Sequence, residues 1–362
     1  MAVYGVMLVL TVLFGFLSQR QLAVPAGGAG DMSWRGKCRS LLGALLAFIP
    51  LLLVSALRDG VGIDYESYQE IFYNIVLYGQ RTHVEWGYYW LNRLVGCFTL
   101  NPQWVFGVSS LLVLGLFMAG IYRYAREHMA FTLFLFIAMG YYFYTMSSIR
   151  YYIAVACAFH AGFCIRDSRL LAAVAYIGLG ALFHKSILIA LPLYLLATLR
   201  FTEKFYLIFT GLGSVFVALS PFLRQLFFWV YPSYAGSKFD VIGRFSLYNV
   251  ALAAGVLLWA LLYRRQLLLG GNQFFLNIAL FAFIFYGFCS WWIPESSRIG
   301  FYLSIFNIVL VPTLVKGEGK ANVRAFYTFC TVTLFTLFLV SMLQKVDSTV
   351  GYAPFLPYRF CF

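Results

Sequence analysis

The sequence predicts an all-α polytopic membrane protein. Of its 362 residues, 62% are hydrophobic and only 11% are charged, which is too few charges to cover the surface of a soluble protein. Apolar stretches approaching bilayer length recur along the whole chain, and short basic or aromatic segments separate them. Because a helix satisfies its own backbone hydrogen bonds in lipid, this pattern is typical of a bundle of membrane helices.

The apolar stretches predict about 12 transmembrane helices. Several stretches are shorter than the ~20 residues that a span usually needs, so aromatic or interfacial residues are expected at their ends. The segment 86–100 is aromatic and contains Arg93, which is more typical of an amphipathic or re-entrant helix than of a crossing. The predicted spans are approximately 2–17, 41–57, 104–122, 129–146, 149–165, 170–183, 186–199, 205–223, 247–263, 273–290, 299–315 and 325–343.

The basic residues predict the orientation of these helices. One set of connections carries most of the excess positive charge, and cytoplasmic loops are enriched in Lys and Arg. Both termini and the segments 58–103, 224–246 and 344–362 are then expected outside. These loops also account for the net charge of +13, so nucleic-acid binding is not expected. The cytoplasmic set comprises Arg20, Arg35, Lys37, Arg39, Arg123, Arg126, Arg166, Arg169, Arg200, Lys204, Arg264, Arg265, Lys316, Lys320 and Arg324.

The domain organisation predicted from the sequence is simple. No polar segment is long enough to form a separate soluble domain, so residues 1–362 are expected to form a single integral membrane domain. The seven cysteines are scattered, mostly within apolar stretches, and have no spacing typical of a metal site. No metal ligands are therefore predicted.

The first external segment opens with an unusual polar cluster, SALRDGVGIDYESYQEIF at residues 55–72. It contributes Arg58, Asp64, Tyr65 and Tyr68, and Glu85 follows in the same segment. An ordinary solvated loop would also explain such a cluster. The alternative is that these residues begin a functional site.

Other polar residues fall on the same predicted side from distant parts of the chain. Arg150 lies in SSIRYY, where two spans meet with almost no loop. His184 and Lys185 lie in LFHKSIL at another short turn, Arg298 lies in WWIPESSRIGFY, and Arg359 lies in PYRF. A charge at bilayer depth costs a few kcal/mol, so it needs a partner or an aqueous cavity.

The chemistry of this cluster suits a lipid-linked sugar. Arginine binds the oxyanions of a phosphate or diphosphate in bidentate fashion. Acids and tyrosines suit sugar hydroxyls, and the aromatic cluster of Trp86, Tyr88, Tyr89 and Trp90 suits stacking on sugar rings. Purely structural roles for these residues remain open. They are Arg58 as an interfacial anchor, Asp64 and Glu85 as loop partners of Arg81 or Arg93, His184 as a hydrogen-bonded interior histidine, and Arg298 paired with Glu295.

Six short motifs, in order along the chain, resemble the EpsG branch of the bacterial Wzy-type polysaccharide polymerases. Each motif alone is weak, but their order and spacing cover nearly the whole sequence. Ile63 and Tyr151 depart from the threonine and glutamine that are usual in the family. The motifs are RDGVGIDYESY (58–68), EWGY (85–88), SIRY (148–151), FHKSIL (183–188), the pair Arg298 and Tyr302, and PYR (357–359).

The resemblance implies a GT-C-like glycosyltransferase of the bacterial inner membrane with its active site facing the periplasm. Such an enzyme polymerises undecaprenyl-diphosphate-linked oligosaccharide repeat units, as in O-antigen or exopolysaccharide synthesis. It transfers the growing glycan to the non-reducing end of an incoming unit. No metal, nucleotide sugar or other cofactor is implied. The implied partners are the lipid-linked donor and acceptor and the bilayer, with a Wzz-type chain-length regulator and a flippase as further candidates.

The site residues are assigned on the resemblance together with the chemistry above. His184 is the preferred catalytic base, because its reference pKa suits neutral pH, and Asp64 and Glu85 are the other catalytic candidates. The predicted diphosphate ligands are Arg58, Arg150, Arg298, Lys185 and Arg359. The predicted sugar ligands are Tyr65, Tyr68, Tyr88 and Tyr302.

Two other functions compete with the polymerase. One is another transferase that acts on a polyprenyl-linked sugar, such as an O-antigen ligase. The other is a lipid-oligosaccharide flippase or transporter, which is expected to carry charge along a path that reaches both faces. The polar residues gather on one predicted side instead, which favours chemistry there.

Overall fold

The computed structural model describes residues 1–20, 34–81, 84–230, 235–236, 240, 246–293, 296–347 and 351–362. Nearly all the regular structure in these ranges is helical. An isolated antiparallel bridge between Arg58 and Phe360 is the one β interaction in this part of the chain. The predicted all-α class is therefore confirmed for the described residues.

The chain packs as two compact units. Unit 1 consists of Met1–Cys157, Leu179–Lys185 and Glu318–Phe362, and unit 2 consists of Ala158–Gly178 and Ser186–Gly317. Two helices, α8 (Ile149–Arg166) and α9 (Leu170–Ala181), contribute residues to both units. Each unit is described on its own below.

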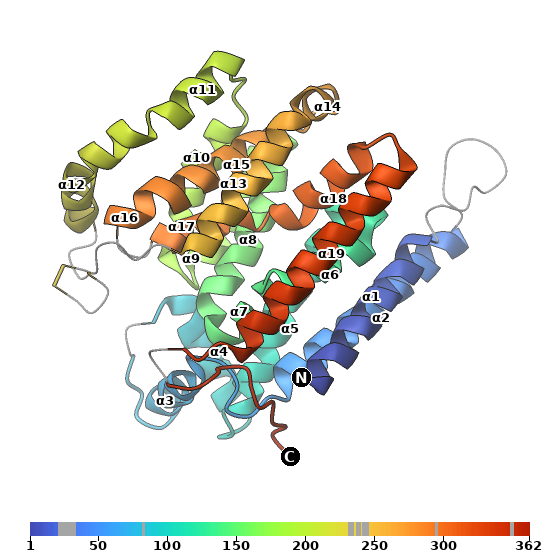
Figure 1. Cartoon of the computed structure of the whole chain (residues 1–362). Coiled ribbons are helices and arrows are strands. Elements are labelled where there is room, and N and C mark those ends of the chain that lie inside the picture. The colour runs from blue at the N-terminus through green and yellow to red at the C-terminus, as the bar shows by residue number, and fades with distance from the viewer. Residues whose placement is uncertain are drawn as a thin grey trace. The chain divides into compact units, whose positions relative to one another are not determined.

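Unit 1 is built around an antiparallel pair, α1 and α2, which lie side by side (Figure 1). The pair approaches closely at Gly43, where a Cβ atom would lie 2.9 Å from the backbone of Ser18. The Ser18 hydroxyl donates to the carbonyl of Ser40 at 2.7 Å. The helices that lie entirely in this unit are α1 (Ala2–Arg20), α2 (Trp34–Ala56), α3 (Tyr65–Val76), α4 (Trp86–Gly96), α5 (Gln103–Tyr124), η1 (Arg126–His128), α6 (Met129–Ala138), α7 (Tyr141–Ser147) and α19 (Ala321–Gln344).

Unit 2 is organised around Phe306, whose ring contacts a cluster of aromatic side chains that includes Phe159, Tyr194 and Phe274. Gly162 permits this packing, because a Cβ atom there would lie 2.3 Å from the Phe306 ring. The helical segments of this unit are η2 (Lys185–Ile189), α10 (Ala190–Ala197), α11 (Glu203–Gly211), α12 (Gly213–Val230), α13 (Leu247–Leu262), α14 (Arg264–Leu269), α15 (Gln273–Ile284), the π-helix η4 (Phe285–Cys289), α16 (Ser290–Trp292), α17 (Ser296–Ser304) and α18 (Asn307–Gly317).

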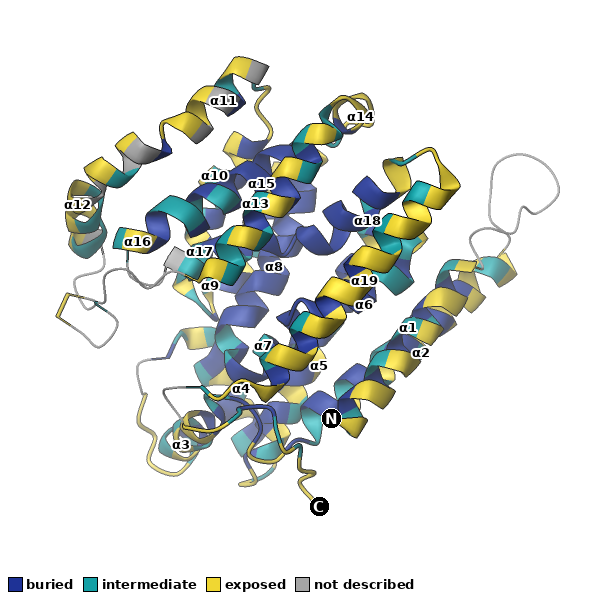
Figure 2. Cartoon of the chain, in the orientation of Figure 1, coloured by how far each residue is buried: buried dark blue, intermediate teal, exposed yellow. Residues whose placement is uncertain are grey.

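The chain is a multi-pass membrane protein. Five helices in the described ranges are long and apolar enough to cross a bilayer: α1, α2, α5, Gln273–Trp292 and α19. Two bent pairs raise this number to seven if each forms one span. The outer face of α19 is exposed along its length, as the yellow stripe in Figure 2 shows, and apolar residues such as Phe329 and Leu337 lie on it. Such a face suits lipid.

The finer prediction of twelve spans is not confirmed, and neither is the GT-C-like fold. The segments 170–183, 186–199 and 247–263 form shorter apolar helices than a span requires. The predicted span 205–223 is broken, because α11 ends at Gly211 and α12 begins at Gly213. The apolar stretch 129–146 is bent by 49° between α6 and α7, where Gly140 has a φ of 88°.

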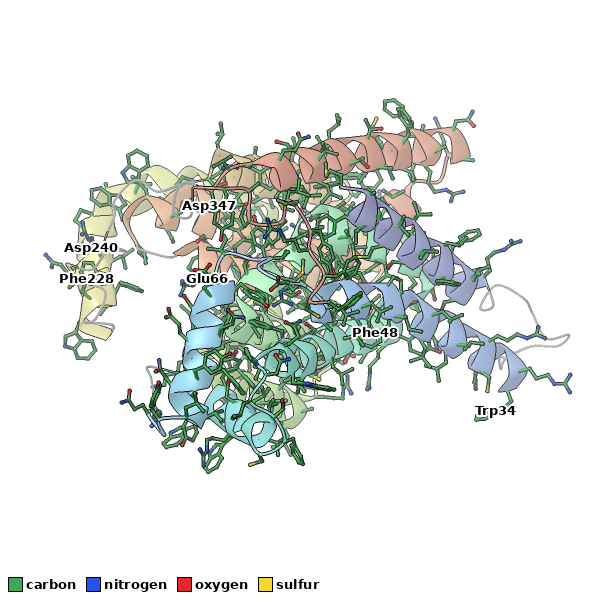
Figure 3. The ribbon with its side chains drawn as sticks, turned by 90° about the horizontal axis from the view of Figure 1, so that it is seen from below. Trp34, Phe48, Glu66, Phe228, Asp240 and Asp347 are labelled. Atoms are coloured by element: carbon green, nitrogen blue, oxygen red, sulfur yellow. The ribbon has the colours of Figure 1, made fainter. Side chains whose placement is uncertain are left out.

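The segment 58–103 contains two short helices, α3 and α4. Helix α3 buries Tyr65, Tyr68, Phe72 and Ile75 on one face, while Glu66 lies at the surface on its first turn (Figure 3). Helix α4 has 11 residues and is therefore roughly 16 Å long, too short to cross a hydrocarbon core of about 30 Å. Most of the predicted external segment 224–246 lies outside the described residues or within α12.

The C-terminal tail holds the start of the segment 58–103 in place. The amide of Asp59 donates to the carbonyl of Arg359 at 3.0 Å. The amide of Gly62 donates to the carbonyl of Pro354 at 2.8 Å. The Tyr358 hydroxyl donates to the carbonyl of Val54 at 3.0 Å. Within unit 1, the two termini and the start of the first segment therefore lie at the same end of the helices (Figure 1).

Candidate functional site

The first polar motif crosses the turn between α7 and α8. Gly62 makes this crossing possible, because its φ is 112° and a Cβ atom there would lie 2.8 Å from the carbonyl oxygen of Met146. The amide of Ile63 donates to the Ser147 hydroxyl at 3.2 Å. A glycine is required here on two grounds, backbone conformation and close approach.

Asp64 lies on the same crossing. Its Oδ2 accepts a hydrogen bond from the Ser148 hydroxyl at 3.3 Å, and the carboxylate is half-buried. Four residues further along, the Tyr68 hydroxyl accepts from the backbone amide of Arg150 at 3.4 Å. The motifs RDGVGIDYESY and SIRY, which are about 80 residues apart in the chain, thus contact each other at several points.

Arg58 is completely buried beneath this crossing. Its Nε donates to the carbonyl of Val61 at 3.1 Å and its Nη2 to that of Met146 at 3.2 Å. Its Nη1 donates to the carbonyl of Ser55, and the guanidinium lies 4.9 Å from the ring centre of Phe106. All of these partners are neutral, and burial lowers the pKa of Arg58 to about 10.

Arg150 has a different environment. Its Nη1 lies 2.6 Å from Oε2 of Glu85, and the two side chains are 24% and 16% exposed. Its Nε is buried and has no hydrogen-bond partner in the described part of the chain. The rest of the Arg150–Glu85 pair is partly exposed and therefore reaches solvent.

The EWGY motif positions Glu85. The residue caps the start of α4 in an extended conformation, but its carboxylate makes no cap bond and extends to Arg150 instead. The amide of Gly87 donates to the carbonyl of Leu182 at 2.7 Å, and a Cβ atom on Gly87 would lie 2.7 Å from the same oxygen. Gly87 thus allows the first turn of α4 to dock against the segment that leads to His184 and Lys185.

A cavity of about 480 Å³ opens where these segments meet. The Glu85 carboxylate is already engaged by Arg150, so Arg81 and Lys185 supply positive charge that no carboxylate among the described residues neutralises in the cavity wall. The guanidinium of Arg81 lies 3.7 Å from the ring centre of Trp86, which is about half exposed. The lining residues are Arg81, Val84, Glu85, Trp86, Ala181, Leu182 and Lys185. Its size falls within the range of small-molecule sites, and its wall suits an anion beside a ring.

The four tyrosines predicted to bind sugar are buried, with exposures of 4%, 6%, 0% and 0% for Tyr65, Tyr68, Tyr88 and Tyr302. Tyr65 stacks on Phe106 with ring centres 4.4 Å apart, and burial raises its pKa to about 12. Burial also raises the pKa of Tyr68. In this conformation they pack within the helices, and their role as sugar ligands stays a prediction.

The remaining predicted residues fall in both units. His184 is half-buried and its ring centre lies 5.3 Å from that of Tyr151, whereas Lys185 and Arg359 are exposed. Arg298 and Tyr302 belong to unit 2, where the Tyr302 hydroxyl lies 2.8 Å from that of Ser186. All the other predicted site residues belong to unit 1. Glu295, the alternative partner of Arg298, lies outside the described residues.

Sequence reasoning assigned no role in the site to Arg81 or Gln103. Gln103 donates to the carbonyls of Ala56 at 2.6 Å and Arg58 at 3.0 Å, and so fixes the end of α2. The alternative that Glu85 pairs with Arg81 or Arg93 is wrong, because its carboxylate binds Arg150. Arg81 lies close before Glu85 and Trp86 in the sequence, and this proximity could have indicated its place in the cavity. Trp86 is exposed.

Comparison with known proteins agrees with the motif pattern. A family model described as the EpsG family matches residues 42–360, a range that contains all six motifs. Comparison with curated proteins and comparison with solved structures each found no match.

Proposed function

The chain belongs to the EpsG family, and on that premise we propose that it is a membrane glycosyltransferase that joins undecaprenyl-diphosphate-linked repeat units into a polysaccharide. The family implies a polysaccharide polymerase. The growing glycan is transferred from its lipid diphosphate to the non-reducing end of an incoming lipid-linked unit. We place this reaction on the periplasmic face of the inner membrane, because the sequence predicts the polar motifs on the side opposite the basic loops.

The observation that carries this proposal is the cavity beside the Arg150–Glu85 pair. It offers Arg81 and Lys185 to an anion and the Trp86 ring to a sugar. A diphosphate that leaves a sugar accumulates negative charge, and preorganised cations stabilise that charge in the transition state. The sugar ring next to it can stack on the indole face.

The reaction is a displacement at the anomeric carbon. A hydroxyl oxygen of the acceptor sugar forms the new bond to that carbon, and the bond from the carbon to the diphosphate oxygen breaks. The diphosphate leaves with the electron pair, and the hydroxyl proton passes to a base. We assign His184 as this base, next to the cavity residue Lys185. A single displacement of this kind inverts the anomeric centre.

The other charged residues take supporting roles. Glu85 holds Arg150 at the cavity, and Asp64 is the alternative base, held by Ser148. We propose that Arg359 also binds the diphosphate, and the role of Arg298, which belongs to unit 2, stays a prediction. Because Arg58 is buried among neutral acceptors, we assign it to positioning the loop that carries Asp64. Two lipid anchors hold donor and acceptor in the membrane plane, which favours their encounter.

The test is a reconstitution of the full chain in liposomes with purified lipid-linked repeat units. A glycan ladder is the expected product, and its formation with a chelator present and no nucleotide sugar tests independence from metal. Products that stop after one transfer would identify a ligase, and no transfer with movement of the lipid across the bilayer would identify a flippase.

The base assignment is tested by His184→Ala, with His128→Ala at the predicted cytoplasmic turn as the matched control. We expect the His184 variant to lose at least 100-fold in extension rate, within the range of general-base effects, and the control to keep its rate. Full chain extension by His184→Ala would overturn the assignment and move the base to Asp64.

A further inference from the structure

Unit 2 contains a cavity of about 510 Å³ that the polymerase mechanism does not use. It lies where the C-terminal ends of α8, α10 and α14 meet the start of α15. Two arginines, Arg166 and Arg200, lie in its wall, and no carboxylate does among the described residues. The lining residues are Arg166, Thr198, Arg200, Phe201, Leu268, Gly271, Gln273 and Phe274.

The segment that carries Arg200 is fixed by buried amides. Asn277, which is 0% exposed, donates from Nδ2 to the carbonyls of Ala197 and Leu199, both at 2.8 Å. Gln273 donates to the same Leu199 carbonyl at 2.5 Å. The backbone next to Arg200 is therefore held in one position before any ligand binds.

Arg166 is oriented as well. Its Nε donates to Oδ1 of Asp167 at 2.8 Å, and its guanidinium lies 4.8 Å from the ring centre of Phe163. Asp167 also binds Arg169 at 3.3 Å, so one carboxylate is shared by two arginines. Arg200 makes no ion pair or side-chain hydrogen bond within the described part of the chain. The cavity therefore carries uncompensated positive charge.

The rest of the wall is apolar. Phe201, Leu268 and Phe274 line the same cavity as the two arginines. A free anion would use only the arginines, whereas a lipid would use both surfaces, with its phosphate on the guanidinium forks and its hydrocarbon on the rings. Arg166 and Arg200 also belong to the connections that the sequence predicts on the cytoplasmic side, where anionic headgroups lie.

We propose that this cavity binds the phosphate group of an anionic lipid, held by Arg166 and Arg200. The apolar wall favours a lipid over free phosphate, which shares the same anionic chemistry. The site is independent of the polymerisation reaction, so it can be tested without the lipid-linked substrates.

The experiment uses the full chain purified in detergent and measures the lipid dependence of its thermal unfolding and the number of bound lipids by native mass spectrometry. Phosphatidylglycerol, zwitterionic phosphatidylcholine and inorganic phosphate are the three probes. We expect phosphatidylglycerol to raise the unfolding temperature and remain bound, and phosphatidylcholine to do neither. If inorganic phosphate alone gives the same shift, the ligand is the free anion and the lipid proposal is wrong.

The site itself is tested by Arg200→Gln, because Arg200 makes no side-chain bond whose loss would disturb the described fold. Its apparent affinity for phosphatidylglycerol should fall at least fivefold, and the double variant with Arg166→Gln should lose the effect. Arg265→Gln removes the same charge from an exposed residue outside the cavity and should keep the affinity. An equal loss of affinity in Arg265→Gln would show only general electrostatic attraction. An unchanged affinity in Arg200→Gln would show that the lipid does not bind at this arginine. Either result would overturn the proposal.

Discussion

Arg58 and Arg150 belong to neighbouring motifs and have the same side chain, but they are used differently. Arg58 is fully buried, and its donors are directed at carbonyl and hydroxyl oxygens of the protein. Arg150 is partly exposed, is paired with Glu85 beside a cavity, and has an Nε without a partner in the described chain. The first guanidinium organises the backbone, and the second lies in an ion pair that is partly exposed.

The partners of an arginine indicate whether it holds the backbone in place or is placed to act on a substrate. Buried carbonyl oxygens need donors, and a guanidinium presents five N–H groups in fixed directions. One such group can therefore join the end of α2, the first loop and the end of α7. An arginine held by one carboxylate keeps charge and donors for an anion. Variants at the two positions should separate stability from activity.

The largest effect is expected for Arg58→Met. It removes the donors to the buried carbonyls of Val61 and Met146, so the free energy of unfolding should fall by about 3 kcal/mol or more. Chain extension should be lost together with the folded protein. Denaturant unfolding in detergent measures the first effect. Arg58→Lys should not restore stability, since one ammonium group cannot reach the separated carbonyl acceptors. A fully stable lysine variant would show that Arg58 does not stabilise the fold through these several bonds.

A large effect on activity with little effect on stability is expected for Arg150→Gln. Loss of a cation at the developing charge should lower the extension rate roughly 10²–10³-fold. The unfolding temperature should change little, because the pair is partly exposed and contributes modest stability. Glu85→Gln and the double variant complete a double-mutant cycle. Strictly additive losses would show that the Arg150–Glu85 pair does not act as a unit.

An intermediate effect is expected at Gly87. Alanine there places a Cβ atom 2.7 Å from the Leu182 carbonyl oxygen, so α4 must shift, at a cost of about 1–3 kcal/mol. The matched control is Gly107→Ala on α5, where a Cβ atom meets nothing within 4 Å. That change should stabilise the helix by about 0.5–1 kcal/mol. Unfolding measurements that rank the two variants the other way would refute the close approach.

The smallest effect is expected for Ser148→Ala. It removes one hydrogen bond, 3.3 Å long, to the half-buried Asp64. We expect a loss of about 1 kcal/mol in unfolding free energy and less than a tenfold change in extension rate. A loss of extension rate as large as that of Arg150→Gln would instead indicate that Asp64 acts as the base of the reaction. The steady-state ladder assay measures this rate.

Sequence reasoning predicted the positions of several helices, because apolar length and flanking charge are local properties of the chain. Apolar length and the flanking basic residues located α1, α2, α5 and α19 to within a few residues at most ends. It did not predict the bend at Gly140, because a continuous apolar stretch has the same composition whether straight or bent. Nor did it predict the helix α3, whose buried face of Tyr65, Tyr68, Phe72 and Ile75 has helical spacing within a charged segment.

Sequence reasoning grouped Arg58, Glu85 and Arg150, and all three lie in unit 1. Their membership of a functional site stays a prediction, and their contacts could not be predicted. The burial of Arg58 could not be predicted, because its acceptors are backbone carbonyls of Val61 and Met146, and a sequence does not distinguish one carbonyl from another. The pairing of Glu85 with Arg150, 65 positions away, likewise depends on packing.

The bonds between the C-terminal tail and the Arg58 loop have a consequence for biosynthesis. Tyr358 and Val54, which bond to each other, are 304 positions apart, so the loop cannot be secured until residue 358 has left the ribosome. Domains commonly fold from the N-terminus during synthesis, but this corner must wait until α19 and the tail that follows it have been made. The Arg58 loop therefore lacks these bonds while the earlier helices are already able to pack.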